Sequence, residues 1–487
     1  MEKYLDKYIV LKKINNFINS YYFLFPVGLF IILSSIFSLE PFCLGAIALV
    51  GIWIFLFNED TRSTLPLIIT GVMCISMKNS LIGTNTPTWG LFSQSWWYAY
   101  LAILAGIVIL GFVYNFMYYK KWSKKYQKMY LGLIPLGFML FTWSLSGIGS
   151  EYWVVNTFYY ILLQLGQVLA FVCLMLSLAT NNKKDNVKYL ATTMVLASVI
   201  VVVELIYCFI TRNVVSDAGQ FNKYKMILGW AVQNLAATYL VFAVPFSYYL
   251  FFINRGNFKK WIYFGYCIFL GVMTFITMSR SNIATLMVIY AACSLHWLHS
   301  SKHQPQTFLW LMLLWILGFS YIVAIWDDPN NPIAQLFGYG FSLNGRGPLN
   351  DFSKYLRTNY PIFGGGWFCF DLEGVEGVHK VSWFTVIPQL FSHNFVNELL
   401  GVTGVVGTIG FISYLGFIVF ITFYDYKQIK LLFLLCFIAL IIDSIFDNFF
   451  FNMDWQRIYV IWTSYLLALT HENKPLHQTL QSVISEY

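Results

Sequence analysis

The chain has 487 residues, of which 58% are hydrophobic and only 11% are charged. A soluble globular protein carries about 25% charged residues, so 30 Lys and Arg with 22 Asp and Glu cannot cover a water-facing surface of this size. The composition excludes an intrinsically disordered chain, a disulfide-rich secreted module and a cytosolic enzyme, and it predicts a protein whose bulk faces lipid.

Apolar runs recur along the whole chain, separated by charged or polar breaks. A helix needs about 17 to 25 such residues to cross the hydrocarbon core of a bilayer. The run at 64–77 is short and contains Pro66, so the sequence predicts an all-α polytopic membrane protein with about 12–14 transmembrane helices. The candidate spans are 21–39, 41–57, 64–77, 96–118, 129–149, 153–180, 189–210, 230–253, 261–279, 281–298, 308–326, 395–424, 430–450 and 455–470.

Basic residues are distributed unevenly between the alternate connecting segments. With the N-terminus placed in the cytoplasm, two thirds of the 30 Lys and Arg residues fall on the cytoplasmic side. Because Lys and Arg are enriched in cytoplasmic loops, we expect both termini to be cytoplasmic and the net charge of +8 to report topology. Membrane lipids, anionic ones included, are expected partners, and nucleic acid is not.

The spans divide the chain into four regions. We expect N-terminal transmembrane helices over 1–188, central transmembrane helices over 189–326, a large extracytoplasmic loop over 327–392, and C-terminal transmembrane helices with a short cytoplasmic tail over 393–487. The loop carries Arg346, Arg357 and several acidic residues. Long charged loops are frequent carriers of function, so this distribution favours chemistry at the outer membrane face.

The end of the loop combines glycines with a histidine. Pro361 is followed by Gly364, Gly365 and Gly366, which permit tight turns, and then by Trp367, whose ring could stack on a sugar. Ser392 is a candidate N-cap of a helix that would run from His393 to Tyr424, about 48 Å long at 1.5 Å per residue. The dipole of that helix would favour a neutral His393, able to accept a proton.

Glycines at every third position, Gly401 to Gly410, are typical of a helix that packs closely on another. Further upstream, Ser279-Arg280 forms an outer turn between two spans, and Asn234-Leu235-Ala236-Ala237 opens a span. Arg212, with Lys223 and Lys225, forms a small outer cationic group.

This ordered series of motifs resembles the superfamily of O-antigen ligases and Wzy-type polysaccharide polymerases, which includes teichuronic-acid polymerases. The family order is an Asn-Ala span, Ser-Arg, a loop from Gly-Arg to Pro-x-x-Gly-x-Gly, and His-Asn before a glycine-rich span. The corresponding residues are Asn234 to Ala237, Ser279-Arg280, Gly345-Arg346 to Gly366, and His393-Asn394 to Gly407. The resemblance covers roughly residues 190–425.

The resemblance implies a glycosyltransferase of the bacterial cytoplasmic membrane that takes glycan from an undecaprenyl-diphosphate carrier at the outer face. It implies no cofactor, nucleotide sugar or metal. His393, Arg280 and Arg346 are the expected catalytic residues: His393 to deprotonate an acceptor hydroxyl, and the arginines to hold the departing diphosphate. The expected substrate-binding residues are Arg212, Arg357, Asn394, Glu398 and Trp367.

Three alternatives remain open at the level of sequence. The preferred activity is polymerisation of a cell-surface polysaccharide, and the nearest alternative is a ligase that transfers the finished glycan to a lipid or wall acceptor. A lipid-linked oligosaccharide flippase or other transporter also suits many spans with outer cations. A structural scaffold for polysaccharide assembly proteins would tolerate loss of all the residues named above.

Two groups of residues could in principle bind metal. Asp327-Asp328 at the start of the large loop could hold a divalent cation, and His296, His299 and His303 have helical spacing for zinc. We expect neither to do so. The histidines fall at a helix end, and the acidic pairs of metal-dependent lipid-linked glycosyltransferases usually lie in the first outer loop, which here offers only Glu40.

Overall fold

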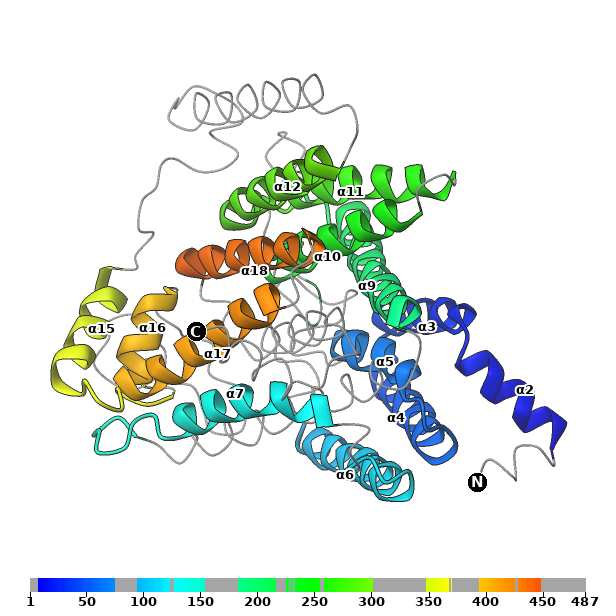
Figure 1. The fold of residues 1–487 in the computed structure, drawn as a ribbon, viewed down its shortest axis with the longest axis horizontal. Helices are drawn as coiled ribbons and strands as arrows, with labels where there is room; N and C mark the ends of the chain where they lie inside the picture. The colour runs from blue at the N-terminus through cyan, green and yellow to red at the C-terminus, as the bar shows by residue number, and fades with distance from the viewer. Residues whose placement is uncertain are drawn as a thin grey trace, which may run out of the picture.

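The structure is a computed structural model, and it describes residues 8–74, 94–122, 127–153, 183–215, 225–226, 228, 230, 233–254, 258–300, 347–367, 369, 394–424 and 428–447. Within these ranges every regular element is a helix (Figure 1). The all-helical class predicted from composition is therefore confirmed for the part of the chain that is described.

Six described helices are long and apolar enough to cross a membrane, and a seventh is added if a bent pair counts as one span. The six are Glu40–Phe57, Ser95–Tyr118, Val187–Thr211, Gln233–Ile253, Ser281–Leu298 and Gly404–Phe423. Together they support a multi-pass membrane protein. The expected spans at 153–180, 308–326 and 455–470 lie outside the described residues.

The N-terminal third folds into one group of helices. After α2 (Ile9–Ile18), the chain forms the 3-10 turn η1 (Tyr21–Phe23) and α3 (Leu24–Phe37). The next two long helices, α4 (Glu40–Phe57) and α6 (Ser95–Tyr118), pack side by side. As far as Cys74, the weak candidate at 64–77 is not one continuous helix but a six-residue α-helix followed by a 3-10 turn, and most side chains of both are buried. Between α4 and α6 the described elements are η2 (Arg62–Thr64), α5 (Leu65–Thr70) and η3 (Gly71–Cys74).

The central helix of the molecule is α10 (Gln233–Ile253). Every side chain from Leu235 to Phe251 is buried, as expected for a helix that is apolar on all sides and surrounded by others. Its main neighbours are α9 (Lys183–Thr211), α11 (Lys259–Ile276) and α12 (Arg280–Ser300). Pro245 lies inside α10, and such a residue is tolerated in a membrane helix because neighbouring groups can satisfy the freed carbonyl.

The helices of the C-terminal third form one connected group with α7 (Gln127–Ser144). α15 (Gly347–Asn359) packs on α16 (Phe395–Val402), and α17 (Gly404–Tyr424) packs along α7. α18 (Gln428–Asp447) lies beside α12 and also contacts α16 and α17, so it joins this group to the centre (Figure 1).

Two expectations for this region are wrong. The helix predicted from His393 to Tyr424 is two helices, because the chain breaks at Thr403 and Gly404 has a left-handed φ of 64°. Its N-cap is Asn394 rather than Ser392: the Asn394 side chain accepts hydrogen bonds from the backbone N–H groups of Val396 and Asn397. The amide of Asn caps a helix as well as a Ser hydroxyl does.

Candidate functional site

Two of the three expected catalytic residues, His393 and Arg346, lie outside the described residues. Arg280 is the first residue of α12, and only its backbone is described. The structure does describe segments next to these residues. It also describes Arg212, Arg357, Trp367, Asn394 and Glu398.

The glycine loop and the glycine-rich helices are joined backbone to backbone. The N–H groups of Gly365 and Gly366 donate to the carbonyls of Gly401 and Val402, at 2.7 and 3.0 Å. In return, the N–H groups of residues 405 and 406 donate to the carbonyls of residues 361 and 362, at 2.9 and 3.1 Å. We call this four-bond junction between residues 361–366 and 401–406 the glycine junction.

The glycine junction explains why α16 and α17 are separate helices. At a continuous helix the carbonyls of Gly401 and Val402 would accept from residues four positions later, whereas here they accept from the loop. Gly364 has φ 69°, and a Cβ at this position would overlap the carbonyl of Val402. A Cβ at Gly404 would overlap the carbonyl of Ile362, so both positions require glycine.

A third segment, the turn that follows α7, closes on the same junction. The Gly147 N–H donates to the carbonyl of Phe363 at 2.8 Å, and the Ser146 hydroxyl donates to the carbonyl of Val402. A Cβ at Gly147 would lie 2.6 Å from the Cα of Gly366. Three segments distant in sequence thus meet with almost no side chain between them.

Trp367 belongs to the packed interior at this place. It is 1% exposed, its Nε1 donates to the carbonyl of Trp143 at 2.7 Å, and the two indole rings meet edge to face at 5.7 Å. The indole that we expected to stack on a sugar therefore secures the loop to α7 in this structure.

Asn394 and Glu398 lie at the start of α16. Asn394 caps α16 through its side chain, and its backbone carbonyl accepts a hydrogen bond from the backbone N–H of Glu398 at 3.0 Å. Glu398 is buried, 1% exposed, and it lies one turn into the helix. Nearby, Asn397 donates to the Asn350 side chain at 2.6 Å, which links α16 to the start of α15. The residue that precedes this cap in sequence is His393.

The Ser-Arg and Asn-Ala motifs are also in contact. The Asn282 side-chain amide donates both to the Ser279 hydroxyl at 2.9 Å and to the carbonyl of Asn234 at 3.1 Å. Asn282 is fully buried. Asn282 was not predicted as a site residue, although its position two residues after Arg280, in the run Ser279-Arg280-Ser281-Asn282, was a usable signal.

Two members of the cationic group, Arg212 and Lys225, donate hydrogen bonds to backbone carbonyls of each other's segments. Arg212 Nη1 donates to the carbonyl of Lys225 at 3.3 Å, and Lys225 Nζ donates to the carbonyl of Asn213 at 3.0 Å. These bonds hold the segment after α9 against the chain that leads to α10. Lys223, the third member expected in this group, lies outside the described residues.

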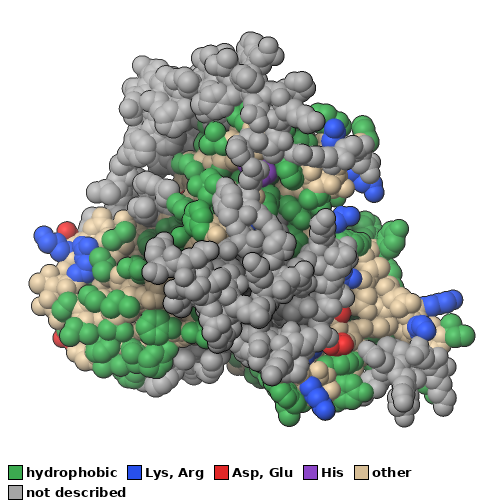
Figure 2. All heavy atoms as spheres, viewed as in Figure 1, with side chains coloured by type: hydrophobic (Ala, Val, Ile, Leu, Met, Phe, Trp, Pro, Cys, Tyr) green, Lys and Arg blue, Asp and Glu red, His purple; other side chains and the backbone are tan. Residues whose placement is uncertain are grey.

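Arg357 lies in the last turn of α15, and an aromatic surface formed by Phe352, Tyr355 and Tyr360 begins on another side of that helix. Figure 2 shows Lys, Arg and acidic side chains together at the edge of the molecule where α15 lies. The Glu151 carboxylate accepts from the hydroxyls of Tyr360 at 3.1 Å and Tyr355 at 3.5 Å. Glu151 was not selected from the sequence, because it follows a predicted span in a short turn.

Tyr152 completes this aromatic surface. Its ring stands edge-on to Phe352, Tyr355 and Tyr360, at 5.3, 6.4 and 6.0 Å between centroids. Partial burial, together with the neighbouring Tyr355 hydroxyl and the Glu151 carboxylate, raises the pKa of Tyr152 above its ordinary value. The Tyr152 phenol is a hydrogen-bond donor at neutral pH, and the shift extends its protonated range to more alkaline pH.

Of the histidines with helical spacing, His296 is described to the side chain. Its Nδ1 lies 2.9 Å from the Tyr248 hydroxyl, and its ring packs against Tyr248 and Phe252. In the described ranges no group of three or more His, Cys, Asp and Glu side chains is placed to hold a metal ion. Asp327, Asp328 and His303 lie outside those ranges.

A comparison of the sequence with known protein families finds no matching family, and a comparison with curated proteins finds no match either. The motifs and the contacts between them are therefore the observations that bear on function.

Proposed function

We propose that the chain is a membrane glycosyltransferase that polymerises a cell-surface polysaccharide from undecaprenyl-diphosphate-linked glycan units. It would act at the outer face of a bacterial cytoplasmic membrane, with about 12–14 spans, both termini in the cytoplasm and residues 327–392 outside.

The observation that supports this proposal most is the pairing of the motifs in space. The Pro-x-x-Gly-x-Gly loop and the segment after His-Asn meet in the glycine junction, and the Ser-Arg and Asn-Ala motifs meet through Asn282. Within each of these two pairs, segments that are distant in sequence are in contact. Such convergence is expected when motifs build one site.

The proposed reaction is a single inverting displacement at the anomeric carbon. The acceptor oxygen forms the new glycosidic bond while the bond from that carbon to the carrier diphosphate breaks. His393 takes the proton of the acceptor hydroxyl, and Arg280 and Arg346 hydrogen-bond to the departing diphosphate. No metal or cofactor enters this proposal.

Arg212, Arg357, Asn394, Glu398 and Trp367 would serve binding of the substrates. Arg212 and Arg357 would contact lipid-linked phosphate or glycan. Asn394, Glu398 and Trp367 would act by fixing α16 and the glycine loop, since two of them are buried and Asn394 is a helix cap.

The test is a reconstituted assay with undecaprenyl-diphosphate glycan on the outer face of proteoliposomes. A polymerase produces longer lipid-linked glycan and releases one carrier diphosphate for each new glycosidic bond. A ligase releases carrier diphosphate only when a second acceptor, lipid or wall glycan, is added. Movement of the lipid-linked glycan across the bilayer without release of carrier diphosphate would replace the proposal with a transporter.

A further inference from the structure

The N-terminal helix α2 presents a different surface on each of three sides. At 100° per residue, Leu11, Asn15 and Ile18 share the side that faces the protein, and Ile18 is buried. A second side carries three exposed apolar residues at positions i, i+4 and i+7, and a third carries exposed polar residues. The apolar side consists of Val10, Ile14 and Phe17, and the polar side of Lys12, Lys13 and Asn16. The exposed Ile9, in the first turn, also falls on the polar side.

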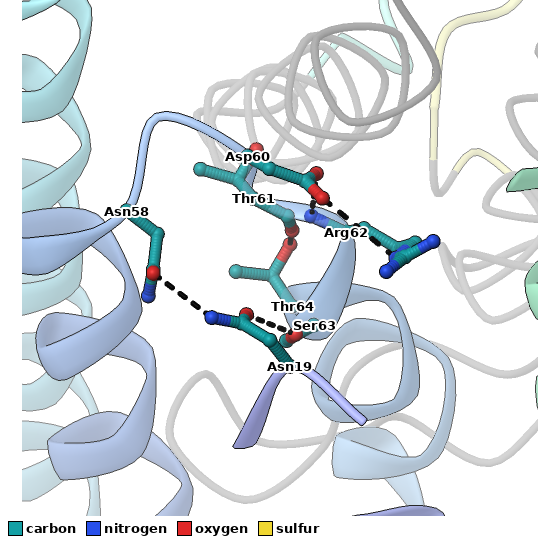
Figure 3. Close-up of polar contacts among 7 residues, drawn as sticks. All are labelled: Asn19, Asn58, Asp60, Thr61, Arg62, Ser63 and Thr64. Carbon is teal, nitrogen blue, oxygen red and sulfur yellow. Dashed lines mark hydrogen bonds and ion pairs between the residues drawn. The ribbon is translucent and has the colours of Figure 1, made fainter. Parts of the chain in front are cut away.

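A set of side-chain amides fixes the rotation of α2. The amides of Asn15 and Asn58 bond to each other in both directions, at 2.8 and 3.0 Å, and Trp53 Nε1 donates to Asn15 at 3.1 Å. Figure 3 shows Asn19 continuing this set, donating to Asn58 at 2.9 Å and accepting from the Ser63 hydroxyl at 2.8 Å. The apolar side therefore cannot turn inward.

The orientation of α2 differs from that of the helix that follows it. α2 is bent by 75° from the helix of residues 21–37 and projects from the rest of the molecule (Figure 1). Membrane helices tilt about 20° on average from the bilayer normal. If residues 21–37 cross the bilayer, α2 runs close to parallel to the membrane surface at its N-terminal end.

The three apolar side chains are 42% to 69% exposed. Leaving them in water costs about 25 cal/mol for each Å² of apolar surface. A helix that lies in the membrane plane with apolar residues on one side and lysines on another matches the composition of interfacial helices. Lysines at the membrane surface attract anionic lipid headgroups.

We propose that α2 is an interfacial helix that binds anionic phospholipid in the leaflet at the N-terminal end of the first span. Val10, Ile14 and Phe17 contact the upper acyl chains, and Lys12 and Lys13 contact the lipid phosphates. The amides of Asn15, Asn19 and Asn58 hold the helix in the rotation that this requires. The proposal is independent of the glycosyltransferase activity.

The test uses the full-length protein in phosphatidylcholine vesicles, with or without added phosphatidylglycerol. A fluorophore on Ile14→Cys or on Phe17→Cys reports the apolar side, and Lys13→Cys on the same helix is the matched control. The seven described cysteines are buried, and the unsubstituted protein sets the background labelling. The two apolar positions are labelled in separate variants, so the test still gives a result if one of the variants fails to fold.

We expect brominated acyl chains to quench the labels at Ile14 and Phe17, and water-soluble iodide to quench the label at Lys13. With the Phe17→Cys label, a brominated phosphatidylglycerol should quench more strongly than the corresponding phosphatidylcholine. Lys12→Gln with Lys13→Gln should lower this preference by about fivefold per lysine, the factor that corresponds to about 1 kcal/mol.

Two results would overturn the proposal. In the first, iodide quenches the labels at Ile14 and Lys13 equally, so both sides of α2 face water. In the second, the label at Ile14 is shielded only at high protein-to-lipid ratio, so a second copy of the chain covers the apolar side.

Discussion

At the scale of single residues, the glycines of the loop are fixed by their neighbours rather than by local flexibility. Gly364 and Gly149 both have left-handed φ angles, 69° and 81°, but only Gly364 lies against another backbone. A Cβ on Gly149 would meet nothing within 4 Å. Substitution at Gly149 therefore introduces backbone strain alone, whereas substitution at Gly364 adds steric overlap with the Val402 carbonyl.

We predict that Gly364→Ala destabilises the protein more than Gly149→Ala does. Both substitutions incur about 1–2 kcal/mol for a left-handed alanine, and Gly364→Ala adds about 1–3 kcal/mol for overlap with the Val402 carbonyl. Thermal unfolding in detergent, followed with a dye that reacts with newly exposed cysteines, gives the comparison. Equal shifts for the two variants would show that Gly364 is not packed against Val402.

The amides that hold α2 give a second prediction at this scale. Asn58→Ala removes three side-chain hydrogen bonds, each contributing about 0.5–1.5 kcal/mol, and leaves Asn15 with fewer partners. It should lower the unfolding temperature in the same dye assay, whereas Asn16→Ala, at an exposed position of α2, should leave it within error. If the two variants behave alike, the amide contacts are not made in solution.

The sequence indicated that Gly364 to Gly366 allow close approach, but it could not name what approaches. The partner carbonyls belong to residues 401 and 402, across the large loop, and the third segment comes from residues 146 and 147. Asn394 replaced Ser392 as the helix cap for a related reason, since both residue types cap helices and the tertiary contacts of α16 select between them.

At the scale of elements, the predicted stripe of glycines packs against α7 only in part. Gly407 and Gly410 lie against α7, whereas Gly401 belongs to α16 and lies against Ser353, and Gly404 lies against the carbonyl of Ile362. A Cβ on Gly410 would overlap the Thr142 hydroxyl and lie 3.1 Å from the Cα of Met139. Gly416, on the same helix, would meet nothing within 4 Å. This pair of positions tests whether α7 and α17 are in close contact.

We predict that Gly410→Ala destabilises the protein by about 1–3 kcal/mol through overpacking. Gly416→Ala should be neutral or stabilising, because alanine favours the helix by up to about 1 kcal/mol. Combining Gly410→Ala with Thr142→Ala should recover part of the loss, with a coupling of about 0.5–3 kcal/mol between contacting residues. Additive losses in this double-mutant cycle, measured by thermal unfolding, would mean that the two side chains do not meet.

Helices whose ends coincide with changes of hydropathy could be predicted from the sequence within a few residues. α4, α6 and α10 follow the expected spans 41–57, 96–118 and 230–253 closely. The break between α16 and α17 could not be predicted, because the run 395–424 stays apolar through it and hydrogen bonds from the loop decide its position. α15 was missed because the charged stretch that contains it gives no apolar run to mark it.

At the scale of the whole molecule, the sequence orients the chain by its basic residues, and surface labelling tests that orientation. Lys354 on α15 and Lys259 at the start of α11 are both exposed, and we expect them on opposite sides of the membrane. In intact cells, a membrane-impermeant thiol reagent should label Lys354→Cys directly. It should label Lys259→Cys only after permeabilisation, and the reverse pattern would invert the topology and place the large loop in the cytoplasm.

The central claim is that His393, next to the Asn394 cap of α16, acts as the base of a glycosyl transfer. The most direct measurement is the rate of carrier diphosphate release and glycan elongation by purified His393→Ala beside the unsubstituted protein, with matched unfolding temperatures. We predict a loss of at least about hundredfold, as expected for a missing general base. Unchanged turnover would contradict the role of His393, and glycan movement across the bilayer with no product from either protein would contradict the glycosyltransferase itself.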